Sequence, residues 1–291
     1  MSRRSAPVPD LRGRRCLITG AASGIGRATA LAAARRGAIV LPTDRNADGL
    51  AETVALVERA GGTVAFAGAA DVADHDAVVA LAAEAHAAGG SVDVVMNVAG
   101  VSVWGPIERL EHRHWRQMVD VNLMGPIHVL EQFVPPMIDA GRGGHVVNVS
   151  SAAGLFGLPW HAAYSAGKFG LRGVSEVLRF DLRRHRIGVS LVCPGAVRTP
   201  IVATTEIVGV DRSAPAAAKL VRQFERHAKT PEQVAERILD GIERDRKLVF
   251  TSADTRAGHL AQRFLPPAYE LSMRLLNDRL VAVARRSPAR P

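Results

Sequence analysis

Short apolar runs alternate with longer segments of helical periodicity along most of the chain. The runs typical of buried strands are residues 15–19, 38–41, 63–67, 92–97, 145–150, 188–193 and 248–250. Helical patterns between them cover residues 24–36, 47–60, 74–88, 111–139, 161–185 and 231–244. Strands that are apolar throughout and alternate with helices are typical of a parallel sheet covered on both faces. The pattern therefore predicts an α/β fold built on a doubly wound, Rossmann-like parallel sheet.

Proline adds one expectation to this pattern, because it lacks an N–H and disrupts the interior of a helix. Pro126, Pro135 and Pro136 all fall inside the 111–139 segment. We expect them to bend or end parts of that helix.

Charge separates the two ends of the chain from its body. Of the net charge of +9, residues 1–15 carry +4 and residues 255–291 carry +5, so the middle is neutral. Without a basic stripe or a basic–aromatic motif in the body, we expect no nucleic-acid partner. We therefore divide the chain into a basic N-terminal tail (1–14), one body domain (15–252) and a basic helical tail (253–291).

The C-terminal tail carries an apolar stripe at helical spacing, made of Tyr269, Met273, Leu276, Leu280 and Val283. Two interpretations are open. The helix packs against protein, or it makes a peripheral contact with an anionic membrane, helped by the tail's arginines. No apolar run reaches the ~18 residues of a membrane-spanning helix. The basic N-terminus has no apolar segment after it, so a cytoplasmic location is expected.

A glycine-rich loop follows the first predicted strand, and a helix follows the loop. It reads Gly20-Ala21-Ala22-Ser23-Gly24-Ile25-Gly26. Glycines let the backbone turn sharply and approach a pyrophosphate, and the helix N-terminus offers free N–H groups. The spacing differs from the common G-x-G-x-x-G fingerprint, but the position between strand and helix favours a dinucleotide-binding loop.

The motif Thr-Gly-x3-Gly-x-Gly, followed later by Tyr-x3-Lys, resembles the short-chain dehydrogenase/reductase family over about residues 13–252. The resemblance implies an NAD(P)-dependent enzyme that interconverts an alcohol and a ketone or aldehyde by hydride transfer. The segment Asn97-Val98-Ala99-Gly100 departs from the family pattern at Val98. By resemblance, the cofactor contacts Gly20, Ser23, Gly24, Ile25, Gly26, Asp71, Val72, Asn97, Ala99, Gly100, Tyr164, Lys168, Pro194, Gly195, Val197 and Thr199.

Asp44 and Arg45, at the end of the second strand, bear on the choice between NAD and NADP. A carboxylate there accepts hydrogen bonds from ribose hydroxyls and repels a 2′-phosphate, whereas a nearby arginine accommodates that phosphate. We expect NAD, with NADP possible.

Tyr164 and Lys168 are four residues apart, which places both on one face of a helix. A nearby cation stabilises a phenolate, so we expect Lys168 to lower the pKa of Tyr164 toward the working pH. Ser151 lies thirteen residues before Tyr164, the spacing of the family's catalytic serine, with Ser150 as its competitor. By resemblance, Asn122 anchors a water in a proton relay through Lys168. The histidines show no convincing ligand pattern, so no metal is expected.

Ser151, Leu158, Trp160 and Tyr164 are the expected substrate-pocket residues, and the apolar ones favour a hydrophobic alcohol or ketone. The family resemblance also implies a homodimer or homotetramer that pairs helices 111–139 and 161–185. Two other functions stay open, because folds do not determine function. One is a catalytically silent nucleotide sensor. The other is an enoyl reductase or epimerase.

Overall fold

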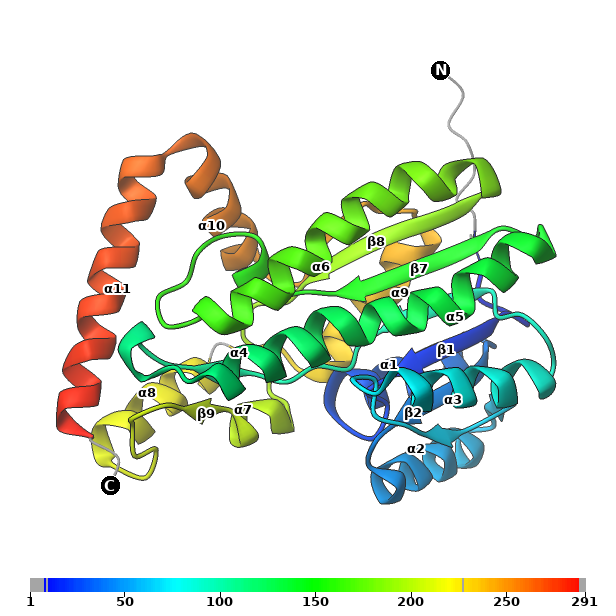
Figure 1. Ribbon diagram of the computed structural model, residues 1–291, viewed down its shortest axis with the longest axis horizontal. Helices are drawn as coiled ribbons and strands as arrows, with labels where there is room; N and C mark the ends of the chain where they lie inside the picture. The colour runs from blue at the N-terminus through cyan, green and yellow to red at the C-terminus, as the bar shows by residue number, and fades with distance from the viewer. Residues whose placement is uncertain (1–7, 9, 227, 288–291) are drawn as a thin grey trace.

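A computed structural model describes residues 8, 10–226 and 228–287 of the chain. From edge to edge its main sheet contains β10 (Leu248–Phe250), β8 (Ile187–Cys193), β7 (Gly144–Val149), β5 (Val94–Asn97), β1 (Arg15–Thr19), β2 (Ile39–Asp44) and β3 (Thr63–Val64). Neighbouring strands all run parallel, and β4 (Gly68–Ala69) also pairs with β2. The predicted parallel sheet is confirmed (Figure 1).

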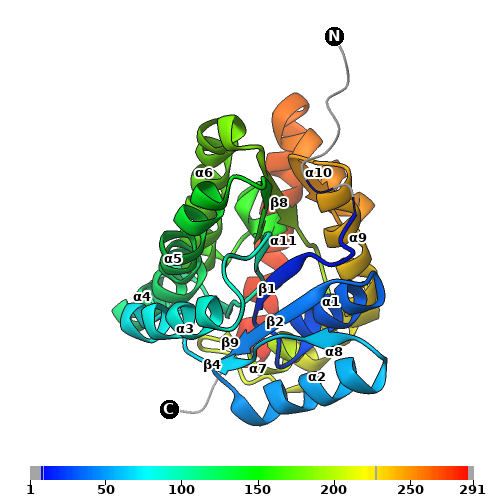
Figure 2. The same ribbon diagram turned by 90° about the vertical axis from the view of Figure 1, so that its right-hand side faces the viewer.

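Helices cover both faces of this sheet (Figure 2). Alternate side chains of each strand enter separate cores: Ile18 and Val40 pack on one face, Leu17 and Leu41 on the other. The first core is closed by α1 (Gly24–Arg35), α2 (Ala47–Arg59) and α9 (Pro231–Glu243). The second is closed by α3 (His75–Ala87), α5 (Gly125–Ala140) and α6 (Ala162–Asp181). Because both faces are buried, the strands carry apolar residues throughout.

The order of the strands places a crevice at the end of β1. This strand lies between β2 and β5, so the chain leaves β1 toward one side of the sheet and later returns to its other side. Ligands bind at the carboxyl ends of strands at such a switch point. The glycine-rich loop therefore opens where a parallel sheet binds its ligand.

The predicted 111–139 helix is wrong as a single element. It consists of α4 (His112–Val119), a π-helical turn (Asp120–Met124) and α5. Pro126 sits in the first turn of α5, where a missing N–H costs nothing. Pro135 and Pro136 lie inside α5, which nevertheless continues to Ala140, so neither of them ends the helix.

Residues 201–230, where the sequence pattern predicts neither helix nor strand, contain regular structure. They form α7 (Pro200–Thr204), β9 (Glu206–Ile207) and α8 (Pro215–Arg226). β9 pairs with β6 (Val103–Trp104) in a separate small sheet. The expected 63–67 strand is likewise divided into β3 and β4.

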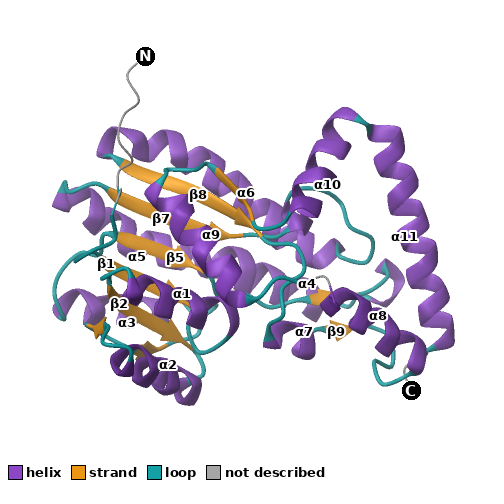
Figure 3. Ribbon diagram, turned by 180° about the vertical axis from the view of Figure 1, so that it is seen from behind, coloured by secondary structure: helices purple, strands orange, loops and turns teal. Residues whose placement is uncertain are grey.

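The C-terminal tail forms two helices, α10 (Ala253–Phe264) and α11 (Pro266–Arg286), which meet at a sharp corner (Figure 3). The Tyr269 hydroxyl donates to the Gly157 carbonyl (2.6 Å), and the Asp211 N–H donates to the Ser287 carbonyl (2.9 Å). Both ends of α11 are thus hydrogen-bonded to the body, as the packed-helix interpretation expects. Within the described residues, no helix is long and apolar enough to cross a membrane.

The expected N-terminal tail falls largely on residues 1–7 and 9, which lie outside the described residues. Within the described part of this segment, Val8 and Leu11 are fully buried in the core on the α1 side of the sheet. These two side chains therefore belong to the packed body.

Candidate active site

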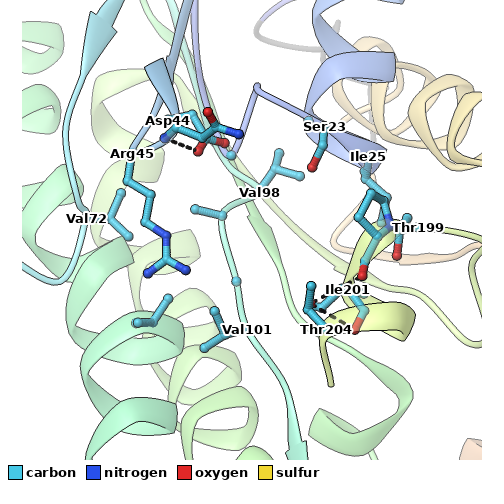
Figure 4. A pocket seen from close by; sticks show the side chains of 18 of the residues that line it. Ser23, Ile25, Asp44, Arg45, Val72, Val98, Val101, Thr199, Ile201 and Thr204 are labelled. Carbon is cyan, nitrogen blue, oxygen red and sulfur yellow. Dashed lines mark hydrogen bonds between the residues drawn. The ribbon is translucent and has the colours of Figure 1, made fainter. Parts of the chain in front are cut away.

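The glycine-rich loop borders a cavity of about 360 Å³, here called the glycine-loop cavity. Figure 4 shows Asp44, Arg45 and Val72 on one side of it, with Ser23, Ile25 and Thr199 on the other. The sequence-predicted residues that line it are Gly20, Ser23, Gly24, Ile25, Gly26, Asp44, Arg45, Asp71, Val72, Ala99, Gly100 and Thr199. The fold thus gathers five separate segments of the chain around one space.

Close backbone approach explains the glycines of this loop. A Cβ on Gly26 would lie 2.0 Å from the Gly20 carbonyl oxygen, and Gly20 itself has a φ of +71°. Only glycine accepts both constraints without a shift of the backbone. The loop is therefore folded flat against the start of α1.

The N-terminus of α1 is open to the cavity. Its cap residue, Ser23, makes no side-chain capping bond, and the first turn contains no acidic residue. The first N–H groups of a helix and its positive dipole end favour an anion at this place. On the same side of the cavity, next to Gly24, the buried Thr199 hydroxyl has no hydrogen-bond partner among the described residues. Together these groups can hold an anionic group such as a pyrophosphate.

Asp44 at the end of β2 accepts one hydrogen bond from the glycine-rich loop and one from the turn that follows β2. Its Oδ2 accepts from the Ala22 N–H (3.0 Å) and its Oδ1 from the Asn46 N–H (2.9 Å). Each carboxylate oxygen keeps a second lone pair for a further donor. The adjacent Arg45 reaches Asp71 at 3.7 Å, and both side chains are largely exposed.

A second cavity of about 430 Å³, the Tyr164 cavity, adjoins the first. Ser151, Tyr164 and Lys168 line it together, as do Pro194, Gly195 and Val197 of the segment after β8. The two cavities share five lining residues, Ile25, Val98, Gly100, Thr199 and Ile201. A ligand that occupies the glycine-loop cavity can therefore reach the phenol of Tyr164.

Ser150 and Ser151, which the sequence left as competitors, have different surroundings. The Ser150 hydroxyl is buried and donates to the Lys168 carbonyl (3.0 Å). The Ser151 hydroxyl accepts from the Ala153 N–H (3.2 Å) and hydrogen-bonds to the Tyr164 phenol. Of the two hydroxyls, that of Ser151 interacts directly with Tyr164.

Burial, more than the neighbouring cation, determines the titration of Tyr164 and Lys168 in the chain alone. Burial raises the pKa of Tyr164 to about 12, although the hydrogen bond from Ser151 acts in the lowering direction. Burial also lowers the pKa of Lys168 to about 8. The Lys168 ammonium lies 5.8 Å from the centre of the Tyr164 ring and donates to the Val149 carbonyl (3.0 Å). The expected lowering of the Tyr164 pKa by Lys168 is therefore not seen in the chain alone, where burial raises that pKa.

Asn122 lies in the π-helical turn between α4 and α5, fully buried beside the site. Its Oδ1 accepts from the Val101 N–H (3.2 Å) and its Nδ2 donates to the Val101 carbonyl (3.0 Å). The side-chain amide therefore fixes the segment that follows β5. A π-turn inside a helix is often associated with a functional site.

Comparison with known proteins agrees with this geometry. A family model described as short chain dehydrogenase matches residues 14–208. The chain is 33% identical over 265 residues to SadH of Mycobacterium tuberculosis, a protein named as an oxidoreductase, covering 90% of this chain and 95% of SadH. The chain belongs to the short-chain dehydrogenase family. As a member of this family it is an oxidoreductase.

Two further similarities extend this result. A short-chain dehydrogenase of Burkholderia phymatum, solved in complex with NAD, superposes with a TM-score of 0.76 at 30% identity, covering 97% of this chain and 98% of that one. A 3beta-hydroxysteroid dehydrogenase of Mediterraneibacter gnavus is 40% identical over 186 residues, 64% of this chain and 66% of that protein. The structural similarity therefore spans the C-terminal helices as well as the sheet.

Three of the residues predicted for this short-chain dehydrogenase line neither of the two cavities: Asn97, Trp160 and the Asn122 described above. Asn97 lines neither cavity: it is buried at the end of β5, and its Nδ2 donates to Asn148 Oδ1 (2.9 Å). Trp160 lines a neighbouring chamber instead of the Tyr164 cavity. Leu158 lines both.

Asp254 and Thr255 also line the Tyr164 cavity, although the sequence analysis assigned Thr255 and its neighbours to a separate tail. They lie in the first turn of α10, where the Thr255 and Ser252 hydroxyls are 3.0 Å apart. No motif in the sequence marks them. The tail of this short-chain dehydrogenase thus begins as part of the site.

Proposed function

We propose that the protein interconverts a hydrophobic secondary alcohol and its ketone, with a nicotinamide nucleotide, preferably NAD, as hydride carrier. The observation that carries this proposal is the junction of the two cavities. The glycine-loop cavity, whose lining suits a pyrophosphate, adjoins the cluster of Ser151, Tyr164 and Lys168. The NAD complex of the similar Burkholderia phymatum enzyme supports the choice of cofactor.

The residues present fit a dinucleotide along its whole length. Asp44 and Arg45 would lie at the adenosine ribose, the α1 N-terminus at the pyrophosphate, and Lys168 at the nicotinamide ribose. Thr199, whose buried hydroxyl has no partner among the described residues, would gain one. When bound, an oxidised nicotinamide accepts hydride and brings a positive charge close to the phenol.

In this proposal Tyr164 moves the proton of the substrate oxygen. Its phenol takes that proton during alcohol oxidation and returns it during ketone reduction. Ser151 donates a hydrogen bond to the same oxygen as its charge changes. Lys168, whose pKa of about 8 lies near neutrality, adds positive charge when protonated and so favours the phenolate. Asn122 holds the Val101 segment in place beside Lys168.

The walls of the Tyr164 cavity support an apolar substrate. Phe156, Leu158 and Trp104 line the cavity beyond the reacting oxygen. Ligand sites of this kind are mostly apolar, with few polar groups that orient the ligand. The similarity to a hydroxysteroid dehydrogenase is in keeping with a bulky apolar alcohol.

A substrate screen tests the proposal. The protein is mixed with NAD or NADP and a panel of secondary alcohols, or with the reduced cofactors and ketones, and the absorbance of the reduced nicotinamide is followed. We expect turnover with apolar members of the panel. Cofactor binding without turnover of any alcohol or ketone would instead favour the nucleotide sensor.

Replacement of Asp44 changes the choice of cofactor. We expect the wild type to bind NADH more tightly than NADPH, because the carboxylate accepts from the ribose hydroxyls and repels a 2′-phosphate. Hydrogen bonds to a charged group contribute about 1.5–3 kcal/mol, so Asp44→Ala is expected to narrow this preference at least about tenfold.

Asp44→Asn tests the effect of the negative charge separately from the effect of the loop's structure. The variant loses the charge, but its amide oxygen still accepts from one of the two backbone N–H groups. We expect this variant to gain NADPH affinity with little loss of stability. The affinities are measured by fluorescence titration. Tighter binding of NADPH by the wild type would refute the assignment and point to Arg45.

We further propose that the protein is a homodimer or homotetramer of closed symmetry. Three large apolar side chains of α6 are exposed: Phe169 (38%), Val177 (59%) and Phe180 (72%). They lie on one of the helices predicted to pair between subunits. Light scattering at micromolar concentration should give a multiple of the monomer mass, and Phe180→Lys should shift it toward the monomer. A monomeric wild type contradicts this proposal.

A further inference from the structure

An apolar chamber of about 380 Å³ lies under α11, beside the Tyr164 cavity. It is called the α11 chamber here. Its walls come from β6, the loop after β7, the β9–α8 region and the inner face of α11. They include Trp104, Ile207, Val210, Leu276, Leu280 and Val283. The volume is in the range of about 300–1,000 Å³ typical of small-molecule sites.

The α11 chamber continues the Tyr164 cavity. Both are lined by Trp104, Leu158 and His161, and by Thr205 and Gln223 on the opposite wall. A substrate whose oxygen lies at Ser151 and Tyr164 can therefore extend past Leu158 into the chamber.

Helix α11 covers one side of this chamber and is attached to the body of the protein. It is hydrogen-bonded to the body at both ends, by Tyr269 to Gly157 and by Ser287 to Asp211. Leu276, Leu280 and Val283 of its apolar stripe face the chamber, whereas Leu271 (59%) and Leu275 (61%) on its other side are exposed. The stripe is therefore used to line a cavity inside the protein, and these three side chains are not presented to a membrane.

Two arginines line the chamber: Arg212, which donates to the Thr205 carbonyl (2.7 Å), and Arg279. Arg279 of α11 is exposed, lines the chamber and donates to Gln223 Oε1. Among the described residues, no carboxylate forms an ion pair with it. An anionic group of a ligand would provide a negative partner for Arg279, since a guanidinium binds carboxylate and phosphate oxygens through paired N–H groups.

We propose that the substrate is an amphipathic acid, with an apolar body in the α11 chamber and an anionic end at Arg279. The reacting alcohol or ketone lies at the opposite end, at Tyr164. This inference rests on the proposed function, since it names the substrate class of the same site. Leu280 and Arg279 are then specificity-determining residues that take no part in the proton transfer.

Binding of simple probes tests the chamber without turnover. Isothermal titration calorimetry is carried out with decanoate, octanoate, 1-decanol and decyltrimethylammonium on the full chain. Each buried methylene strengthens binding about fourfold, so octanoate should bind about 16-fold more weakly than decanoate. Decanoate should also bind at least tenfold more tightly than decyltrimethylammonium. Absent binding of decanoate, or equal binding of the anion and the cation, overturns the proposal.

Substitutions on the two faces of α11 locate the binding site. Leu280→Trp fills the chamber and should weaken decanoate binding at least tenfold, and Val283→Phe provides a second, smaller obstruction. Leu275→Trp, on the exposed face of the same helix, is the matched control and should leave binding unchanged. Arg279→Gln should weaken decanoate binding about tenfold and leave 1-decanol binding unchanged. If Leu280→Trp and Leu275→Trp changed decanoate affinity equally, decanoate would not bind in the α11 chamber, and the proposal would be overturned.

Competition distinguishes a failure of this inference from a failure of the proposed function. Decanoate should inhibit oxidation of a substrate alcohol competitively, and Leu280→Trp should raise KM for long substrates more than for short ones. Turnover with no such length dependence contradicts the chamber while leaving the dehydrogenase function intact. Decanoate binding that Leu280→Trp abolishes, in a protein that turns over no alcohol or ketone, supports the chamber as a ligand site and contradicts the proposed function.

Discussion

Tyr164→Phe is expected to lower kcat for alcohol oxidation by about 10²- to 10⁴-fold, because general acid–base catalysis contributes about that much. The substitution removes one hydroxyl from the Tyr164 cavity and leaves the ring in place. Cofactor affinity should therefore change little, which steady-state kinetics and a binding titration measure separately.

The chain supplies a matched control for this experiment, since Tyr269 is its other tyrosine. The Tyr269 hydroxyl donates to the Gly157 carbonyl and lies on α11, away from the reacting oxygen. Tyr269→Phe should keep kcat within a few-fold of the wild type. Equal activities of the two variants would remove Tyr164 from its proposed role.

The pH profile follows from the same assignment. Burial raises the pKa of Tyr164 to about 12 in the chain alone, so the phenol is mostly protonated at neutral pH. Oxidation requires the phenolate, and its kcat/KM should rise with pH. Reduction requires the phenol, and its kcat/KM should fall at high pH. Any residual activity of Tyr164→Phe should lack this dependence.

Gly26→Ala is expected to disrupt the cofactor loop. The added Cβ would lie 2.0 Å from the Gly20 carbonyl oxygen and 2.5 Å from its carbon, and neither atom can move without the backbone. Overpacking of this kind costs about 1–3 kcal/mol of the free energy of unfolding. A displaced loop also misplaces the N–H groups of α1, so NAD affinity should fall at least about tenfold.

The control for this variant is Arg35→Ala, in the exposed last turn of the same helix. Calorimetric unfolding and NAD titration are compared for both variants. If Gly26→Ala binds NAD as tightly as Arg35→Ala does, the loop does not approach the pyrophosphate.

The parallel sheet and the glycine-rich loop could be predicted because local signals specify them. Strand β1 and the start of α1 lie where the apolar run and the glycines indicated. Spacing from Tyr164 favoured Ser151 over Ser150 as the catalytic serine. The contact that distinguishes their surroundings, the hydrogen bond from Ser150 to the Lys168 carbonyl, is tertiary and has no signal in the sequence.

Other features depend on packing between distant segments. The π-turn at Asp120–Met124 interrupts a pattern that looks like one helix, and the nearby Pro126 indicated a bend without indicating its form. The periodicity of α11 predicted a helix and its apolar face, yet not what that face would contact. Asp254 and Thr255 reach the Tyr164 cavity because they follow the carboxyl end of β10, which pairs in parallel with the end of β8. Helix α8 was missed although Pro215 stands at its start, a favoured first position.

Deuterium transfer tests the central claim of hydride transfer at this site most directly. The most active alcohol of the screen is deuterated at its carbinol carbon and incubated with NAD and the enzyme, and the reduced cofactor is analysed by mass spectrometry. The account predicts NADH that carries one deuterium at the nicotinamide ring, and formation of this product at least about 100-fold more slowly with Tyr164→Phe. Reduced cofactor without deuterium, or none with any alcohol of the panel, would contradict it.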